Sequence, residues 1–187
     1  MPKTITDEQL VQKITTGDKE LYSEIVQRYQ AKLVRYTTML LNGNVAAAED
    51  VVQETFIKSY INLRSFNVKR KFSSWIFRIS HNEAMNYIRK HKKEIQHDDE
   101  EWESKIVDYR PNQSEEVDEM FKNKKISKAL SKLDLKYREP LVLYIYHGNS
   151  YAEIGNILKM PAATVGVRIS RAKTQLKTIF KKEGIKT

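Results

Sequence analysis

The 187-residue sequence contains no cysteine. It can therefore form no disulfide, offers no thiol nucleophile and cannot bind zinc through thiolates, which fits a reducing compartment. It also lacks an apolar run near the roughly 20 residues that span a bilayer, the best being residues 141–146 (LVLYIY). Residues 1–8 show no apolar stretch and no small-residue cleavage site, so we expect a cytoplasmic protein without membrane insertion.

Patterns that support catalysis are missing as well. The sequence has no glycine-rich loop to cradle a phosphate and no nucleophile paired with a base. The run 97–101 (HDDEE) contains metal-ligand residue types, but no periodic apolar pattern surrounds it to fix ligand geometry. His81 and His147 are isolated, and we interpret them as surface or capping residues. We therefore expect no enzyme activity, no metal and no cofactor.

Acidic residues are scarce outside one segment. Residues 1–93 contain 16 Lys and Arg against 9 Asp and Glu, and residues 121–187 contain 15 against 4. Residues 94–120 reverse the balance, with 2 against 11. Each basic block is either a well-solvated surface or a polyanion-binding one, and charge alone does not distinguish them.

The first basic block reads as a compact helical module over residues 1–93. Thr6 and Gln9 form a capping-box pattern, Asp18 can cap a longer helix, and residues 42–44 (NGN) interrupt it. A helix of about 20 residues follows, with an apolar stripe at spacings of three and four. Ser73 or Ser74 is expected to cap the next helix. The expected stripe consists of Val45, Ala48, Val52, Phe56, Tyr60 and Leu63.

The remaining residues read as a linker and a second module. Residues 94–120 cannot bury enough apolar surface to offset their ordering entropy, so we expect an acidic flexible linker. In residues 121–187, Gly148 is suited to a helix C-cap, and residues 150–153 (SYAE) form a capping box. A short helix, a break at residues 159–161 and a last helix then predict a helix-turn-helix. The predicted fold is all-α, with two small helical domains joined by the linker.

The last helix has the pattern of a DNA recognition helix. Its apolar residues, from Val165 to Ile179, follow a 4-3-4-3 spacing that buries one side. The opposite side is small and semi-polar near its start and basic at its edges, as close approach to a major groove requires. A generic amphipathic helix is the alternative. The candidate duplex-contacting residues are Ala163, Thr164, Val167, Arg168, Arg171 and Lys173.

The first module carries a second candidate surface for nucleic acid. Four aromatic residues at positions 66, 72, 75 and 77 are interleaved with four cations at 69–71 and 78. Ring faces and cations together hold single-stranded DNA, and each stacked base contributes about 1–3 kcal/mol. Several rings are nevertheless expected in the core, and Trp75 is expected to anchor the loop. The candidate residues are Phe66, Lys69, Arg70, Lys71, Trp75, Arg78 and Asn82.

Three ordered motifs resemble the extracytoplasmic-function (ECF) sigma factors of bacterial RNA polymerase. The resemblance covers residues 6–93 and 123–181. The motifs are 48–56 (AEDVVQETF), 72–79 (FSSWIFRI) with Asn82, and 150–154 (SYAEI) with Pro161, 164–165 (TV) and 168–173 (RISRAK).

The resemblance implies specific partners and roles. It implies that Asp50, Gln53 and Glu54 dock on core RNA polymerase, although an exposed acidic helix face is the simpler alternative. The loop 65–71 would take a flipped base of the minus-ten promoter element, with Asn82 reading a neighbouring base. The helix after Pro161 would read the minus-thirty-five element, and an anti-sigma factor would restrain the protein.

One departure and one rival interpretation remain. Gly166 and Val167 stand where relatives often carry a basic and a small polar residue, so base contacts there stay open. The rival is a stand-alone helix-turn-helix regulator whose first module binds a partner or ligand. The aromatic and basic surface of the first module argues against it, as does a linker suited to two separate DNA contacts.

Overall fold

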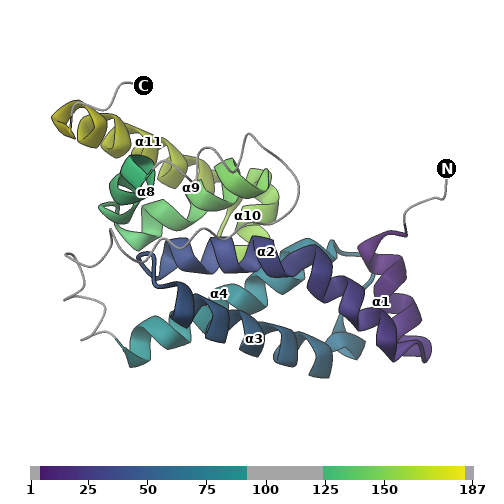
Figure 1. Ribbon diagram of the computed structural model, residues 1–187. Helices are drawn as coiled ribbons and strands as arrows, with labels where there is room; N and C mark the ends of the chain where they lie inside the picture. The colour runs from purple at the N-terminus through teal and green to yellow at the C-terminus, as the bar shows by residue number, and fades with distance from the viewer. Residues whose placement is uncertain (1–4, 92–123, 184–187) are drawn as a thin grey trace.

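The computed structural model describes residues 5–91 and 124–183 and is all-helical over those ranges (Figure 1). The predicted fold class is therefore confirmed. No helix in the described ranges combines the length and apolarity that crossing a bilayer requires. The expected linker, residues 94–120, and the acidic run 97–101 lie outside the described residues.

Over residues 5–91 the first module consists of four α-helices and two short 3₁₀ helices. Thr6 and Gln9 form the predicted capping box, in which the Gln9 amide donates to the Thr6 hydroxyl over 3.2 Å. Asn44 caps the third helix by accepting from the Ala47 amide over 3.0 Å. The elements are α1 (Asp7–Thr16), η1 (Lys19–Leu21), α2 (Tyr22–Leu40), α3 (Val45–Ile61), η2 (Leu63–Ser65) and α4 (Phe72–Lys90).

Two predicted caps are wrong. Asp18 makes no side-chain capping bond, because η1 intervenes and α2 starts only at Tyr22. Helix α4 starts at Phe72, one residue before the expected serines. Its first amide donates instead to a carboxylate oxygen of Glu8 on α1, over 2.9 Å. The entry of α4 is thus stabilised by a residue 64 positions earlier in the chain.

The buried side of α3 differs from the predicted stripe. Tyr60 is 43% exposed, whereas Thr55 and Ser59 are completely buried. Both hydroxyls are satisfied inside the module, since Thr55 donates to the Val51 carbonyl over 2.8 Å and Ser59 donates to the Phe56 carbonyl over 3.0 Å. Small side chains with satisfied hydroxyls let α3 approach its neighbours closely, and the larger tyrosine is left at the edge.

The described part of the second module, residues 124–183, contains four helices, and the predicted caps flank the break between the second and third of them. Gly148 ends α9 with a left-handed φ of 62°, and Ser150 and Glu153 form the capping box of α10. Pro140 lies inside α9. The helices are α8 (Lys124–Ser131), α9 (Leu135–His147), α10 (Tyr151–Leu158) and α11 (Ala162–Glu183).

The turn between α10 and α11 depends on glycine. A Cβ atom at Gly155 would lie 2.6 Å from the backbone oxygen of Met160, which is too close for any real side chain. Lys159 adopts a left-handed φ of 53° and ends α10. These two features fold the chain back tightly, and they set α11 against α10 as a helix-turn-helix.

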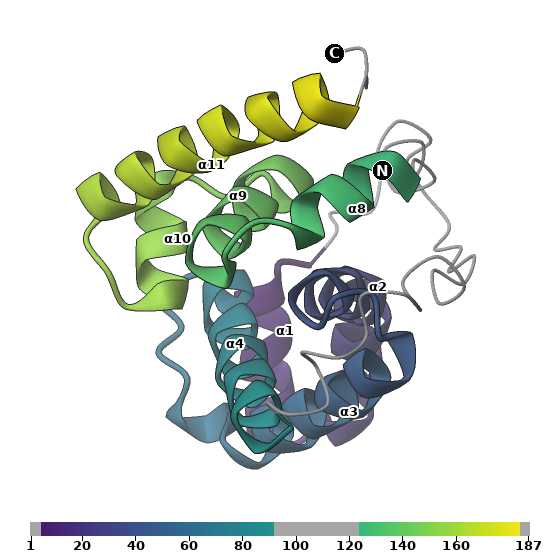
Figure 2. The same cartoon turned by 90° about the vertical axis from the view of Figure 1, so that its left-hand side faces the viewer.

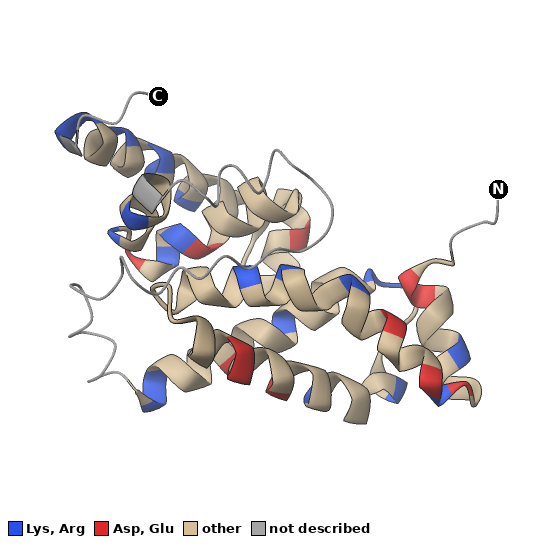
Figure 3. Cartoon of the chain, viewed as in Figure 1, with Lys and Arg blue, Asp and Glu red and all other residues tan. Residues whose placement is uncertain are grey.

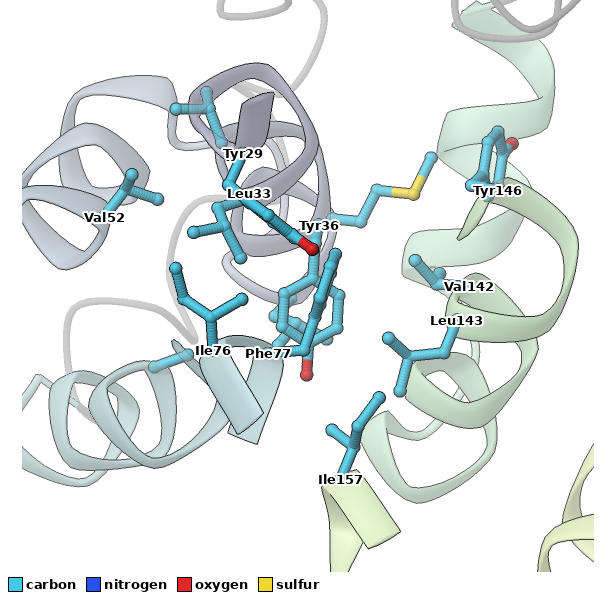
Figure 4. Packing of buried hydrophobic residues seen from close by; sticks show 14 of the residues in the cluster. Tyr29, Leu33, Tyr36, Val52, Ile76, Phe77, Val142, Leu143, Tyr146 and Ile157 are labelled. Atoms are coloured by element: carbon cyan, nitrogen blue, oxygen red, sulfur yellow. The ribbon is translucent and has the colours of Figure 1, made fainter. Parts of the chain in front are cut away.

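The two modules pack against each other. Helix α10 lies on α4, and α9 lies on α2, as both views of the chain agree (Figures 1 and 2). Figure 4 shows Tyr36 of α2 and Phe77 of α4 facing Leu143 of α9 and Ile157 of α10. These side chains are nearly or fully buried, so one apolar core continues from one module into the other.

Buried polar groups join α9 to the first module. The Glu139 carboxylate, 5% exposed, accepts from the Tyr36 hydroxyl over 2.5 Å and lies 2.6 Å from Nδ1 of His81. Arg138, also 5% exposed, donates to the Asn42 side chain over 2.6 Å and to the Leu40 carbonyl over 3.2 Å. Its cation therefore lies at the C-terminal end of α2, where the helix dipole is negative.

The interpretation of His81 and His147 as surface or capping residues is wrong. His81 contacts Glu139 across the junction of the modules. The ring of His147 packs at 4.8 Å from the Phe77 ring and 6.0 Å from the Tyr36 ring, measured between centroids. Its Nε2 atom is shielded from solvent and has no hydrogen-bond partner within the described part of the chain. Both histidines belong to the contact between modules.

Candidate nucleic-acid interface

An acidic face lies on α3. Asp50, Gln53 and Glu54 are all exposed, and the acidic residues of α3 stand out in Figure 3. Lys58 pairs with Glu54 over 3.3 Å and with Glu83 of α4 over 2.6 Å. The α3 face thus presents acceptors to a partner. The ion pair between Lys58 and Glu83 links the C-terminal end of α3 to α4.

The aromatic cluster of the first module supports a loop more than it presents rings. Phe66 is 7% exposed and Phe72 is fully buried, with ring centroids 5.4 Å apart and planes perpendicular. Trp75 is partly exposed and packs on both rings, at 5.3 and 5.5 Å. The rings therefore hold the loop before α4 in a defined shape, as was expected for Trp75.

The same loop exposes its cations. Lys69 and Arg70 are exposed, and their amides donate to the Asn67 side-chain oxygen and carbonyl over 3.0 and 2.9 Å. This local turn keeps the backbone compact and leaves both basic side chains free to extend into solvent. Helix α4 itself exposes Asn82 near its middle and Arg89 near its C-terminal end.

Helix α10 binds two cations of this surface. Lys71 donates to Glu153 over 2.5 Å, and both Nε and Nη2 of Arg78 donate to the Asn156 carbonyl, with Nε at 2.8 Å. The Lys71 ammonium and two bonds from Ser150 lower the pKa of the Glu153 carboxyl to about 2. In return, Glu153 raises the pKa of Lys71. The same two cations are therefore engaged within the protein.

Helix α11 has a buried side and an outward side, and the predicted duplex-contacting residues lie on the outward side. Val165, Ile169, Ala172 and Leu176 are buried as the spacing predicted. On the other side, Ala163, Val167, Arg171 and Lys173 are exposed, and Thr164 and Arg168 are partly buried. Figure 3 shows basic residues gathered toward the C-terminal end of α11.

An aromatic edge that was not predicted from the sequence lies beside α11. Tyr144 of α9 and Tyr151 of α10 are 38% and 39% exposed, and their ring centroids lie 5.5 Å apart. Lys173 places its ammonium 5.0 Å from the Tyr144 ring, and a Cβ atom at Gly166 would lie 3.3 Å from the Tyr151 ring. Each helix was considered separately from sequence, and only the fold brings these residues together.

The candidate residues form separate groups. The loop 65–71 and α4 hold the group predicted to contact single strands, with Asn82 apart from the loop, and α11 holds the group predicted to contact duplex. Helix α10 lies between α4 and α11, so the two groups are on different sides of it (Figure 2). The acidic face belongs to α3, which packs on the opposite side of the first module from α10.

Comparison with known proteins identifies two family regions and close relatives. Residues 25–94 match sigma-70 region 2, and residues 123–176 match sigma-70 region 4. The ECF RNA polymerase sigma factor SigW of Bacillus subtilis strain 168 is 34% identical over 174 residues, which is 89% of this chain and 92% of that protein. The ECF sigma-E factor of Haemophilus influenzae is 31% identical over 188 residues, with 94% and 96% covered.

Two solved structures share the fold. The sigma factor RpoE of Bartonella quintana, in complex with the anti-sigma factor NepR, has a TM-score of 0.67 at 26% identity and covers 86% of this chain and 96% of that one. CnrH in complex with the cytosolic domain of CnrY has a TM-score of 0.67 at 23% identity, with 94% and 97% covered. The arrangement of helices over both modules is thus one already known.

Proposed function

The chain belongs to the ECF RNA polymerase sigma factors, and from this we propose which surfaces bind core polymerase and which bind each promoter element. Residues 1–93 act as region 2, residues 121–187 act as region 4, and residues 94–120 join them. The observation that carries the assignment is that α4 and α11 present two separate polar, basic surfaces on one chain. A polymerase holding both could place one on melted DNA and the other on duplex.

The acidic face of α3 docks on core RNA polymerase. Asp50, Gln53 and Glu54 are exposed and present acceptors, and exposed Ile57 lies one turn after Gln53 on the same side of α3. Such a face selects a basic partner surface, because charge complementarity steers association and penalises wrong partners. The net positive charge of the chain makes this acidic face electrostatically distinct from its surroundings.

The loop 65–71 and α4 receive the unpaired minus-ten strand. Lys69, Arg70 and Lys71 supply cations for the backbone, and exposed Asn82 can bond a base edge with both its donor and its acceptor. Phe66 and Trp75 serve mainly to shape the loop, because their rings are buried or packed on Phe72. Arg78 completes the set once it is released from α10.

Helix α11 reads the minus-thirty-five duplex. Ala163, Thr164 and Val167 lie near its start, where a recognition helix enters the major groove. Arg168, Arg171 and Lys173 lie where cations reach bases or the flanking phosphates. Helix α10 and its tight turn, which requires Gly155, hold α11 at a fixed angle to the rest of the module.

Release of α10 from α4 is a condition for minus-ten binding. In this arrangement Glu153 would repel a DNA phosphate at Lys71, and the Asn156 carbonyl takes the Nε and Nη2 donors of Arg78. The free protein is therefore expected to bind promoter DNA poorly, and core polymerase to separate the two modules. An anti-sigma factor, the partner seen with the RpoE relative, would act by holding this closed arrangement or by covering the docking faces.

Sigma factors in general are initiation factors without enzymatic activity. For this chain we expect the same, with the polymerase supplying all bond chemistry. Its place of action is then the bacterial cytoplasm, where polymerase and promoters lie. The helix-turn-helix regulator that acts alone is not favoured, because both family regions and the length of the relatives match the whole sigma arrangement.

Run-off transcription tests the proposal. Purified protein and core polymerase are incubated with a pool of genomic fragments, and transcripts are sequenced to locate their start sites. We expect a discrete set of starts preceded by two shared elements, and little promoter binding by the protein alone. Tight sequence-specific binding by the free protein, without stimulation of core polymerase, would instead support the stand-alone regulator.

A further inference from the structure

Val167 occupies the middle of the outward side of α11. It is 52% exposed, while Val165 and Ile169 on the same helix are buried. At about 100° per residue, Val167 lies roughly 200° around the helix from Val165, so it points directly away from the core. An aliphatic side chain at this position makes no hydrogen bond to water, phosphate or a polar base edge.

Toward the start of α11 the side chains around Val167 are small, whereas exposed Ser170 and Arg171 lie one turn later on the same side. Ala163 lies one turn earlier on the same side, and Gly166 carries no side chain. The Tyr151 ring covers that bare backbone, since a Cβ atom at Gly166 would lie 3.3 Å from its Cε2 atom. Val167 thus projects from a low surface bounded on one side by an aromatic ring.

In a major groove, such a side chain has one apolar group to meet. The groove edges of guanine, cytosine and adenine are polar, whereas thymine adds a C5-methyl group. Facing a polar edge, Val167 would strip water from donors or acceptors without replacing the hydrogen bonds. Facing a methyl group, it loses no hydrogen bond and buries apolar surface on both partners.

We propose that Val167 is a specificity residue that contacts the C5-methyl group of a thymine in the minus-thirty-five duplex. The inference rests on the proposed function of α11, and it names the base that Val167 contacts. Arg171, one turn after Val167 on the same side, and Arg168, at the edge of that side, act on phosphates or on neighbouring bases. The position that departs from the family pattern thereby becomes one that selects for a methyl group.

Replacing thymine by uracil tests the contact, because uracil keeps the base pair and removes only the methyl group. Wild-type holoenzyme at limiting concentration is assayed by run-off transcription on one of its promoters. Each thymine of the minus-thirty-five element, on either strand, is replaced in turn. At one position we expect transcription to fall about fourfold, the factor corresponding to about 0.8 kcal/mol for one buried methyl-sized group.

Val167→Ala then identifies the side chain that senses the methyl group. The variant is expected to transcribe thymine and uracil templates at that position equally well, while its response at other positions stays as in the wild type. Thr178→Ala is the matched control, because Thr178 is an exposed β-branched residue on the same helix, about 16 Å further along. It should retain the wild-type difference.

Each other outcome overturns the inference. Wild-type holoenzyme that tolerates uracil at every position, or a promoter without thymine in this element, means that no methyl group is read. A Val167→Ala holoenzyme that keeps the wild-type sensitivity means that another residue reads it. The proposed function fails separately, if no promoter is transcribed at all or if α11 variants leave promoter choice unchanged. Circular dichroism melting of each variant shows that it is folded.

Discussion

Acidification should weaken the folded protein through His147. Burial between α9, α4 and α2, with smaller contributions from the cations Arg35 and Lys32, lowers the pKa of this histidine from 6.5 to about 3. Between these two pKa values, His147 is protonated in the unfolded chain and neutral in the folded chain. The stability contributed by the neutral ring is complete above pH 6.5 and is lost as pH falls toward 3.

The magnitude follows from the two pKa values. At pH 7.5 the ring is neutral in both states and contributes almost no pH dependence. At pH 5.0 the unfolded ring is protonated and the folded ring is not, which costs the folded state about 2 kcal/mol. Glu153 adds little in this window, because its carboxyl is charged in both states until pH approaches 4.5 and below.

Urea unfolding at constant ionic strength measures the effect. The free energy of unfolding is determined at pH 7.5 and 5.0 for the wild type and for His147→Phe, which keeps an aromatic ring against Phe77. Other titrating groups act in both proteins, so the difference between their pH dependences isolates His147. We expect the wild type to lose about 2 kcal/mol more than the variant.

Two results would refute this reasoning. The first is an equal loss of stability in both proteins between the two pH values. The second is a ring that titrates near pH 6.5 in the folded protein, followed by NMR of its carbon-bound protons. Either result would mean that water reaches Nε2 and that the contact between α9 and the first module is open in solution.

Further variants probe the junction, the turn and the two promoter surfaces. Tyr36→Phe removes a donor from the buried carboxylate of Glu139 and should lower the free energy of unfolding by about 1.5–3 kcal/mol in urea; an unchanged value would mean the bond is absent in solution. Gly155→Ala should cost about 1–3 kcal/mol by the same measurement, because the added carbon overlaps the backbone of the turn. Asn82→Ala should change base preference in a minus-ten promoter library while its affinity for core polymerase, measured by fluorescence anisotropy, stays the same; an unaltered preference would remove its reading role. Arg171→Ala should weaken minus-thirty-five engagement by about 1–3 kcal/mol at one base pair, whereas a uniform loss across sequences would assign it to phosphate.

Local sequence signals were sufficient where a helix end is built from neighbouring residues. Thr6, Ser150 and Gly148 cap their helices as predicted, since each cap is completed within a few positions. The start of α4 was misplaced because its first amide bonds Glu8, which no window around residue 72 contains. The error at Asp18 has a related cause, as a short 3₁₀ helix replaces the expected cap.

The contact between the modules was beyond the reach of periodicity. The spacing of apolar residues predicts one buried side for each helix. Helix α9 is instead buried against α11 on one side and against α2 on another. Arg138 and Glu139 are charged, yet both are buried, with partners in α2, in the turn after α2 and in α4. For the candidate sites, the sequence predicts which types of side chain are present and which helix face they lie on. It does not predict that Lys71 and Arg78 bond to α10.

The bonds that Lys71 and Arg78 donate to α10 affect how DNA binding depends on ionic strength. A protein cation that moves from bulk water to DNA displaces counterions. Each such contact adds about −0.9 to the slope of log affinity against log salt concentration. Lys71 instead leaves a carboxylate, so salt weakens the bond it gives up as well as the one it gains. The intact chain should thus show a shallower salt dependence at this surface than its number of cations suggests.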